Sequence, residues 1–149
     1  MSAPAFASAL VFALGALALC PAHAQNRVAN YGAGQPGTVS YEHFSFWTND
    51  GRRTDIHYAY GKARQDVSLR YVGRARLAGK PGFRVRFPDG HLLSLVPDGN
   101  TLRVTTNGTP PKTFTWEYEG PVNGVGTNCS VCTDDAAAAM QLLRKCYLR

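Results

Sequence analysis

Three cysteines near the C-terminus have the chemistry that is easiest to constrain. Cys129 and Cys132 form a Cys-x-x-Cys pair, and Cys146 lies further along the chain. Thiols in an oxidising compartment form disulfides. A helix between Cys132 and Cys146 rises about 1.5 Å per residue and separates them by about 20 Å, whereas a disulfide needs Cα atoms within about 7 Å. The sequence therefore predicts a Cys129–Cys132 disulfide and a buried free thiol at Cys146.

Cys-x-x-Cys is also the pattern of thiol–disulfide oxidoreductases, in which a helix N-terminus lowers the pKa of the attacking thiol. Those centres occur in a βαβ context, which this chain lacks. Thr133 stands where haem attachment requires a histidine, and no fourth ligand at suitable spacing completes a zinc site. A structural disulfide is therefore favoured, and neither a cofactor nor a metal is predicted.

His57 is the candidate for acid–base chemistry. It shares a predicted strand face with Asp55, and Ser68 or Ser94 would complete a Ser–His–Asp group if the fold brought the three together. The chain has no Gly-x-Ser-x-Gly and no His-Glu-x-x-His motif. An enzyme, either a thiol oxidoreductase or a small hydrolase, is therefore the alternative and not the main expectation.

Arginine carries most of the positive charge in a chain whose net charge is +6. Four arginines alternate with apolar residues on predicted strands, and they form the candidate ligand-binding face: Arg70, Arg84, Arg86 and Arg103. Arg74 and Arg76 would extend this row. Guanidinium groups bind carboxylate and phosphate in a forked geometry, so the row predicts a cationic docking face. The competing interpretation is a solvated face that Asp66, Glu117 and Glu119 neutralise.

Two further features point to ligands less directly. Residues 120–128 are rich in glycine, which suits either a backbone nest for an anion or a simple link to the last element. Basic strands with aromatic residues also occur in oligonucleotide-binding barrels. Here, however, Phe83, Phe87 and Phe114 share the phase that must fill the core, and export separates the protein from nucleic acid. Nucleic acid is therefore not the expected partner.

The elements that must position these residues are short strands. Apolar and charged residues alternate most clearly over residues 83–87, and Pro88-Asp89-Gly90 is one of several turn signals. About seven strands follow one another, joined by hairpin-length connections that are too short for a crossover helix. The prediction is a mainly β (α+β) domain: a single curled antiparallel meander that forms a barrel or a sandwich.

One C-terminal helix is predicted from about Asp134 to Tyr147. Asp134 and Asp135 suit the cap and the first turn, where carboxylates are favourable. Apolar residues then recur on one face: Ala136, Met140, Leu143 and Tyr147. We expect this helix to cover one end or one open face of the sheet.

The N-terminus is typical of a secretory signal. Residues 5–19 are apolar but shorter than the roughly 20 residues that a membrane-spanning helix needs. Ala22-His23-Ala24 follows, with small residues at the positions that a signal peptidase reads, so residues 1–24 are expected to be cleaved. Lipidation at Cys20 is the weaker alternative. The mature protein is expected to have no transmembrane segment.

The remainder divides into two parts. Residues 25–38 are rich in Gly, Asn, Gln and Pro and are predicted to be a flexible leader. Residues 39–149 form the single β-rich domain with its C-terminal helix. The features together predict an exported domain, periplasmic or secreted, without enzymatic activity. It would bind a protein or an anionic component of the cell envelope through the arginine face, as an inhibitor or immunity-type protein does.

Overall fold

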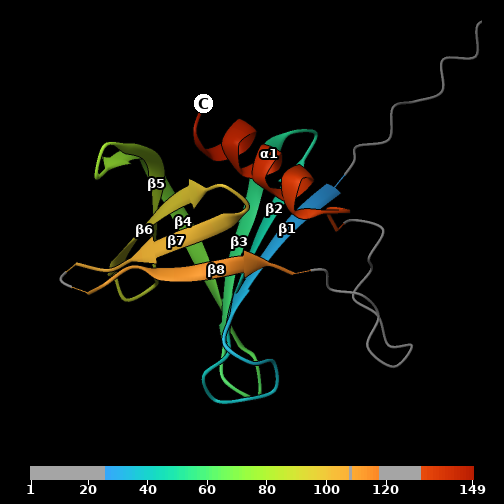
Figure 1. The fold of residues 1–149 in the computed structure, drawn as a ribbon, viewed down its shortest axis with the longest axis vertical. Coiled ribbons are helices and arrows are strands. Elements are labelled where there is room, and N and C mark those ends of the chain that lie inside the picture. The colour runs from blue at the N-terminus through green and yellow to red at the C-terminus, as the bar shows by residue number, and fades with distance from the viewer. Residues whose placement is uncertain (1–25, 108, 118–131) are drawn as a thin grey trace, which may run out of the picture.

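A computed structural model describes residues 26–107, 109–117 and 132–149. Eight strands and one helix lie in these residues: β1 Asn26–Ala33, β2 Glu42–Asn49, β3 Arg52–Tyr60, β4 Gln65–Leu77, β5 Lys80–Arg86, β6 Leu92–Asp98, β7 Thr101–Thr105, β8 Lys112–Trp116 and α1 Ala136–Tyr147. The strands form one closed barrel in chain order (Figure 1). All neighbouring pairs are antiparallel, including β1 with β8. The predicted β-meander with a C-terminal helix is confirmed, as a barrel with one strand more than expected.

The additional strand is β1, which lies in the segment predicted to be a flexible leader. It pairs with β2 along its whole length, and Tyr31 pairs with Trp116 of β8, so β1 closes the barrel. The side chains of Ala29 and Tyr31 are fully buried in the core. The prediction of a flexible leader is therefore wrong for these residues. Because β1 is rich in Asn, Gly and Ala, its composition is typical of a loop, although Ala29 and Tyr31 face the barrel interior.

The phase predicted for the central strands is confirmed. In β5, Phe83 and Val85 are fully buried while Arg84 and Arg86 are exposed. The same alternation places Leu102 and Phe114 in the core from β7 and β8. The barrel interior is therefore filled by one apolar face of a continuous sheet, and the polar residues of the same strands form its outer wall.

An irregularity in β4 changes the face on which its last residues lie. β4 continues to Leu77, but Val72 is an extra residue between two positions that pair with β5. One extra residue inverts the alternation that follows it. Beyond the bulge Arg74 pairs with the inward-facing Phe83, so Arg74 and Arg76 do not extend the row that begins at Arg70. They line a separate hollow beside the end of the helix.

The helix α1 closes one end of the barrel (Figure 1). Asp135 is its N-cap, and its carboxylate accepts a hydrogen bond from the backbone N–H of Ala138 at 2.7 Å. The ring of Tyr147 stacks on Phe83 at a centroid distance of 4.9 Å and meets the edge of Phe46 at 5.5 Å. The predicted C-terminal helix is confirmed. Its cap is Asp135, and no acid lies in its first turn, so the assignment of both Asp134 and Asp135 to the cap and first turn is only partly correct. No helix in the described ranges has the length and apolar character needed to cross a membrane.

The C-terminal end of α1 is fastened to the barrel wall by polar contacts. The guanidinium of Arg53 in β3 donates to the backbone carbonyl of Cys146 and lies 4.0 Å from the centroid of the Tyr71 ring. The hydroxyl of Tyr71 donates to the carbonyl of Tyr147 at 3.1 Å. The thiol of Cys146 donates to the carbonyl of Gly51 at 3.2 Å. These contacts fix the C-terminal end of the helix against this end of the barrel.

Candidate functional site

The barrel end opposite α1 contains a cavity of about 490 Å³, which we call the cup. Two strands show that the cup and the helix occupy opposite ends. In β2, Phe46 contacts Tyr147 of the helix, whereas Phe44 lines the cup. Phe83 in β5 stacks on Tyr147, whereas Phe87, which directly follows β5, lines the cup. The remaining lining residues are Glu42, Tyr58, Tyr60, His91, Leu93, Val104, Thr106, Thr109, Pro110, Lys112 and Phe114.

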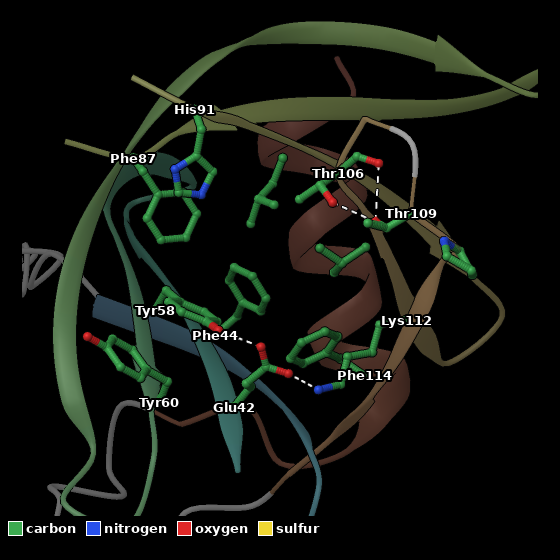
Figure 2. A pocket seen from close by; sticks show the side chains of 13 residues that line it. Glu42, Phe44, Tyr58, Tyr60, Phe87, His91, Thr106, Thr109, Lys112 and Phe114 are labelled. Carbon is green, nitrogen blue, oxygen red and sulfur yellow. Dashed lines mark hydrogen bonds and ion pairs between the residues drawn. The ribbon is translucent and has the colours of Figure 1, made fainter. Parts of the chain in front are cut away.

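Six of the thirteen residues that line the cup carry an aromatic ring, counting the imidazole of His91 (Figure 2). The ring of Phe44 lies 5.0 Å from Tyr58 and 4.9 Å from Phe114, measured between centroids. Tyr58 in turn lies 5.4 Å from Phe87, which stacks on His91 at 4.0 Å. These rings come from distant parts of the chain and present both faces and edges to the cavity. Such a wall suits a flat or ring-containing apolar group.

Charged side chains lie at the mouth of the cup. The carboxylate of Glu42 accepts a hydrogen bond from the hydroxyl of Tyr58 at 2.6 Å and forms an ion pair with the ammonium of Lys112. Figure 2 shows this carboxylate between the two partners, beside Phe44 and Phe114. Burial raises the pKa of Tyr58, with a smaller contribution from Tyr60, so its hydroxyl stays protonated and keeps donating to Glu42. The mouth therefore combines a fixed anion with a cation.

Sequence reasoning missed Glu42 and Lys112 as functional residues. Each begins its strand, β2 or β8, and each has the same phase as a core aromatic residue two positions later, Phe44 or Phe114. A charge in the apolar phase of a strand is the signal that would have identified both. It is readable in the sequence, but which two strands adjoin the same opening follows only from the closed barrel.

Three of the four predicted arginines lie together on the outer wall. Arg70 in β4 is directly opposite Arg86 in β5, and Arg84 lies on the same face of β5. All three are exposed, and none forms an ion pair or hydrogen bond with the described residues. We call these three residues the arginine patch. The patch is therefore a strongly cationic part of the surface. Placing like charges directly opposite one another costs free energy, which an anionic ligand would relieve.

Arg103 does not join this patch. It lies in β7, with β6 between it and β5, and its guanidinium is 3.7 Å from the carboxylate of Asp98. Lys80 contacts the same carboxylate at 2.9 Å, and this hydrogen-bonded ion pair and the charge of Arg103 lower the pKa of Asp98. Arg103 thus contacts a carboxylate that it shares with Lys80, and it does not belong to the arginine patch.

The acids expected to neutralise the row contact other groups. The carboxylate of Asp66 lies 2.8 Å from the imidazole of His57, and Glu117 accepts a hydrogen bond from the hydroxyl of Tyr41. Glu119 lies outside the described residues. The two carboxylates that the structure places are therefore engaged away from Arg70 and Arg86.

His57 does meet a serine and an aspartate, but on the outer wall. Ser68 is its cross-strand partner in β4, and Asp66 approaches its Nδ1 atom, whereas Asp55 and Ser94 do not take these places. Within the residues placed by the structure, no hydrogen bond joins the Ser68 hydroxyl to His57. A nucleophilic serine needs that bond and a neighbouring oxyanion site. This group lies away from the cup and lacks the geometry of a hydrolase site.

The cysteine predictions meet the structure only in part. Cys146 is a buried thiol, as predicted, and burial raises its pKa. Cys132 forms a parallel bridge with Val28, and its sulfur accepts a hydrogen bond from the amide of Asn30 at 3.9 Å. Cys129 lies outside the described residues, so the Cys129–Cys132 disulfide stays a prediction. The same holds for the signal in residues 1–24, lipidation at Cys20 and the glycine-rich residues 120–128.

Comparisons of the chain with protein-family models, with curated proteins and with solved structures found no significant match. In residues 26–107, 109–117 and 132–149, no three His, Cys, Asp or Glu side chains lie close enough together to share a metal ion. Two features of the barrel are therefore its candidate binding surfaces: the cup and the arginine patch.

Proposed function

We propose that the protein is an exported, non-enzymatic binding domain and that its cup binds a small molecule with an apolar, ring-containing body. One observation carries this proposal. The barrel is closed by α1 at one end and leaves an aromatic-lined cavity of about 490 Å³ at the other. Ligand sites in proteins are typically concave and mostly apolar, with volumes of about 300–1,000 Å³ and a few polar groups that fix orientation.

The size of the barrel supports the same conclusion. An eight-stranded barrel has an interior that is either filled by side chains or holds one small ligand. Here Phe46, Phe83 and Tyr147 fill the helix end, while the other end holds an unfilled cavity between residues of most of the strands. Because the wall belongs to a hydrogen-bonded sheet, the cup is pre-formed and little ordering free energy is lost on binding.

A neutral fluorescent naphthalene, N-phenyl-1-naphthylamine, tests this proposal. The wild-type protein is expected to bind one molecule, with a rise in emission and a shift to shorter wavelength as the dye leaves water. Thr106→Trp places a large side chain in the cup and should weaken binding by at least about tenfold, the effect of about 1.4 kcal/mol. Thr105→Trp is the matched control, because Thr105, the last residue of β7, pairs with Ser94 and does not line the cup.

Two results would overturn the proposal. One is the absence of saturable binding to the wild-type protein. The other is binding to Thr106→Trp that equals binding to Thr105→Trp, since the dye would then lie outside the cup. Circular dichroism of both variants shows that the barrel is intact before their affinities are compared.

The arginine patch supports a second candidate function, docking to an anionic component of the cell envelope or to an acidic protein surface. The supporting observation is the direct opposition of Arg70 and Arg86, with Arg84 beside them and no carboxylate on any of the three among the described residues. Unrelieved guanidinium groups on adjacent strands bind phosphate or carboxylate in forked geometry. This surface is separate from the cup, so one barrel can carry both functions.

Vesicles of phosphatidylglycerol test the second candidate at low salt. The wild-type protein should bind them, and the double variant Arg84→Glu/Arg86→Glu should not. Arg27→Glu/Arg52→Glu is the control, because it changes net charge equally at exposed residues away from the patch. If both double variants lose binding equally, the effect belongs to net charge and the patch is not a docking surface.

A further inference from the structure

We propose that the cup takes an organic cation, an amine or quaternary ammonium on an apolar body, and that Lys112 occupies the place of this cation in the ligand-free protein. The inference deepens the proposed function and rests on it. Its starting point is the position of the Lys112 ammonium, which pairs with Glu42 and lies 5.7 Å from the centroid of the Phe114 ring. The structure thus already holds an ammonium group between a carboxylate and an aromatic face.

The carboxylate is the fixed member of this ion pair. Glu42 is 27% exposed, and its other oxygen accepts the hydrogen bond from Tyr58. Lys112 is 50% exposed and carries its charge on a flexible four-carbon stem. When a ligand enters, the lysine can move into water at little cost, whereas the glutamate would have to leave a partly buried position and lose its hydrogen bond from Tyr58. A ligand is therefore expected to replace Lys112 and to pair with Glu42.

The rings around Glu42 favour the same sign of charge. The ring of Phe44 lies 5.0 Å from that of Tyr58 and 4.9 Å from that of Phe114, and Figure 2 shows all three beside the carboxylate. The face of an aromatic ring is negative and attracts cations, and sites for quaternary ammonium ligands are commonly cages of such rings. A ligand carboxylate would instead face these rings and the charge of Glu42. The site consequently selects a cation with an apolar body that fills the rest of the cup.

Three benzyl compounds of different charge test the inference by displacement of N-phenyl-1-naphthylamine. They are benzyltrimethylammonium, its neutral isostere neopentylbenzene, and the anion phenylacetate. The measured quantity is the ratio of cation to neutral affinity on each protein variant, because this ratio does not depend on how well that variant holds the dye. For the wild-type protein we expect the cation to bind about fivefold more tightly than the isostere, since it must compete with Lys112.

Two substitutions in the ion pair change this ratio in opposite directions. Lys112→Met removes the competing ammonium and should raise the preference for the cation by about a further tenfold, within the range of a desolvated cation–π contact. Glu42→Gln removes the anion but keeps the shape of the side chain, and it should reduce the ratio to about one. Lys80→Met is the control, because Lys80 pairs with Asp98 away from the cup; its ratio should equal that of the wild-type protein.

The outcomes separate this inference from the function on which it rests. If the dye and neopentylbenzene bind but the cation has no advantage, or if phenylacetate binds best, the cup is a ligand site and the cation inference is wrong. A ratio that Glu42→Gln leaves unchanged has the same meaning. If neither the dye nor any of the three compounds binds, the proposed function itself is wrong.

Discussion

Arg53 joins the barrel wall to the helix through a hydrogen bond to Cys146 and a stacking contact on Tyr71. Arg53→Ala removes both contacts at once. We expect the free energy of unfolding to fall by about 1–3 kcal/mol, the sum of a charged hydrogen bond and a cation–π contact. Arg52→Ala, the preceding residue of β3, makes none of these contacts and should change stability by less than about 0.5 kcal/mol. Urea unfolding measures both; equal losses would show that the contact does not hold the helix.

Cys146 should react slowly with thiol reagents in the folded protein. Its thiol is buried, donates to the carbonyl of Gly51 and has a raised pKa, and all three effects reduce the amount of accessible thiolate. We expect iodoacetamide at pH 8 to label Cys146 at a small fraction of the rate seen after unfolding in urea. A non-reducing peptide map of the same samples tests the predicted Cys129–Cys132 bond. Rapid labelling of folded protein, or a cross-linked peptide containing Cys146, would contradict this assignment.

Strand alternation alone predicts correctly whether several single residues face the core or the outer wall. Phe83, Val85 and Phe114 were placed in the core, and Arg84 and Arg86 on the outer wall. Alternation does not predict which side chain of another strand a residue contacts. Glu42 in β2 pairs with Lys112 in β8, although nothing near either residue in the chain indicates its partner.

At the scale of elements, the cap of α1 gives a sharp prediction. The carboxylate of Asp135 satisfies the backbone N–H of Ala138, which has no partner within the helix. Asp135→Ala should therefore lower the free energy of unfolding by about 1 kcal/mol. Asp134→Ala is the matched control, because its exposed neighbouring carboxylate makes no such bond and should have little effect. Equal effects in thermal or urea unfolding would mean that only charge near the helix N-terminus matters.

The elements themselves were largely predictable because turn residues and period-two alternation mark most of the strands. β1 was missed because Gly, Ala and Asn lower its apparent hydrophobicity, even though Ala29 and Tyr31 fill the barrel. The bulge at Val72 was missed for another reason: an extra residue changes pairing with β5 but leaves a strand-like sequence. Both errors concern pairing between strands, which local patterns do not encode.

For the whole molecule, three tyrosine hydroxyls and one thiol with raised pKa values predict that the free energy of unfolding falls at alkaline pH. Burial raises the pKa of Tyr31, Tyr147, Tyr58 and Cys146 above their ordinary values. Below the pKa values of the unfolded chain, about 8.5 for cysteine and 10 for tyrosine, their contribution is fully present. As pH rises further, the unfolded state releases protons that the folded state retains, so the free energy of unfolding falls.

Urea unfolding between pH 8 and pH 11 measures this dependence. The wild-type protein should lose stability progressively above about pH 9. Tyr147→Phe should have a shallower slope, by up to about one proton, because it removes one of the groups that only the unfolded chain releases. Stability that is constant or rises over this range would contradict the burial of these groups.

The cup could not be predicted from the sequence because it forms only when the sheet closes into a barrel. Its residues come from the starts of β2, β6 and β8, the ends of β3 and β7, and the residues that follow β5 and β7, so no continuous segment carries the site. Closure itself depends on a short pairing of β1 with β8, elements that lie far apart in the chain. The arginine row, in contrast, was visible as a pattern, and the structure retained three of its four members.

The central claim, that the open end of this barrel is a pre-formed ligand site, is tested most directly by nuclear magnetic resonance. ¹⁵N-labelled protein would be titrated with N-phenyl-1-naphthylamine while backbone amide shifts are followed. If the cup binds the dye, saturable shifts will be centred on the strands around the cup, at Phe44, Tyr58, Leu93, Val104 and Phe114, with little change along α1. Shifts centred on Arg70, Arg84 and Arg86, or on the helix, or no saturable shift at all, would contradict it.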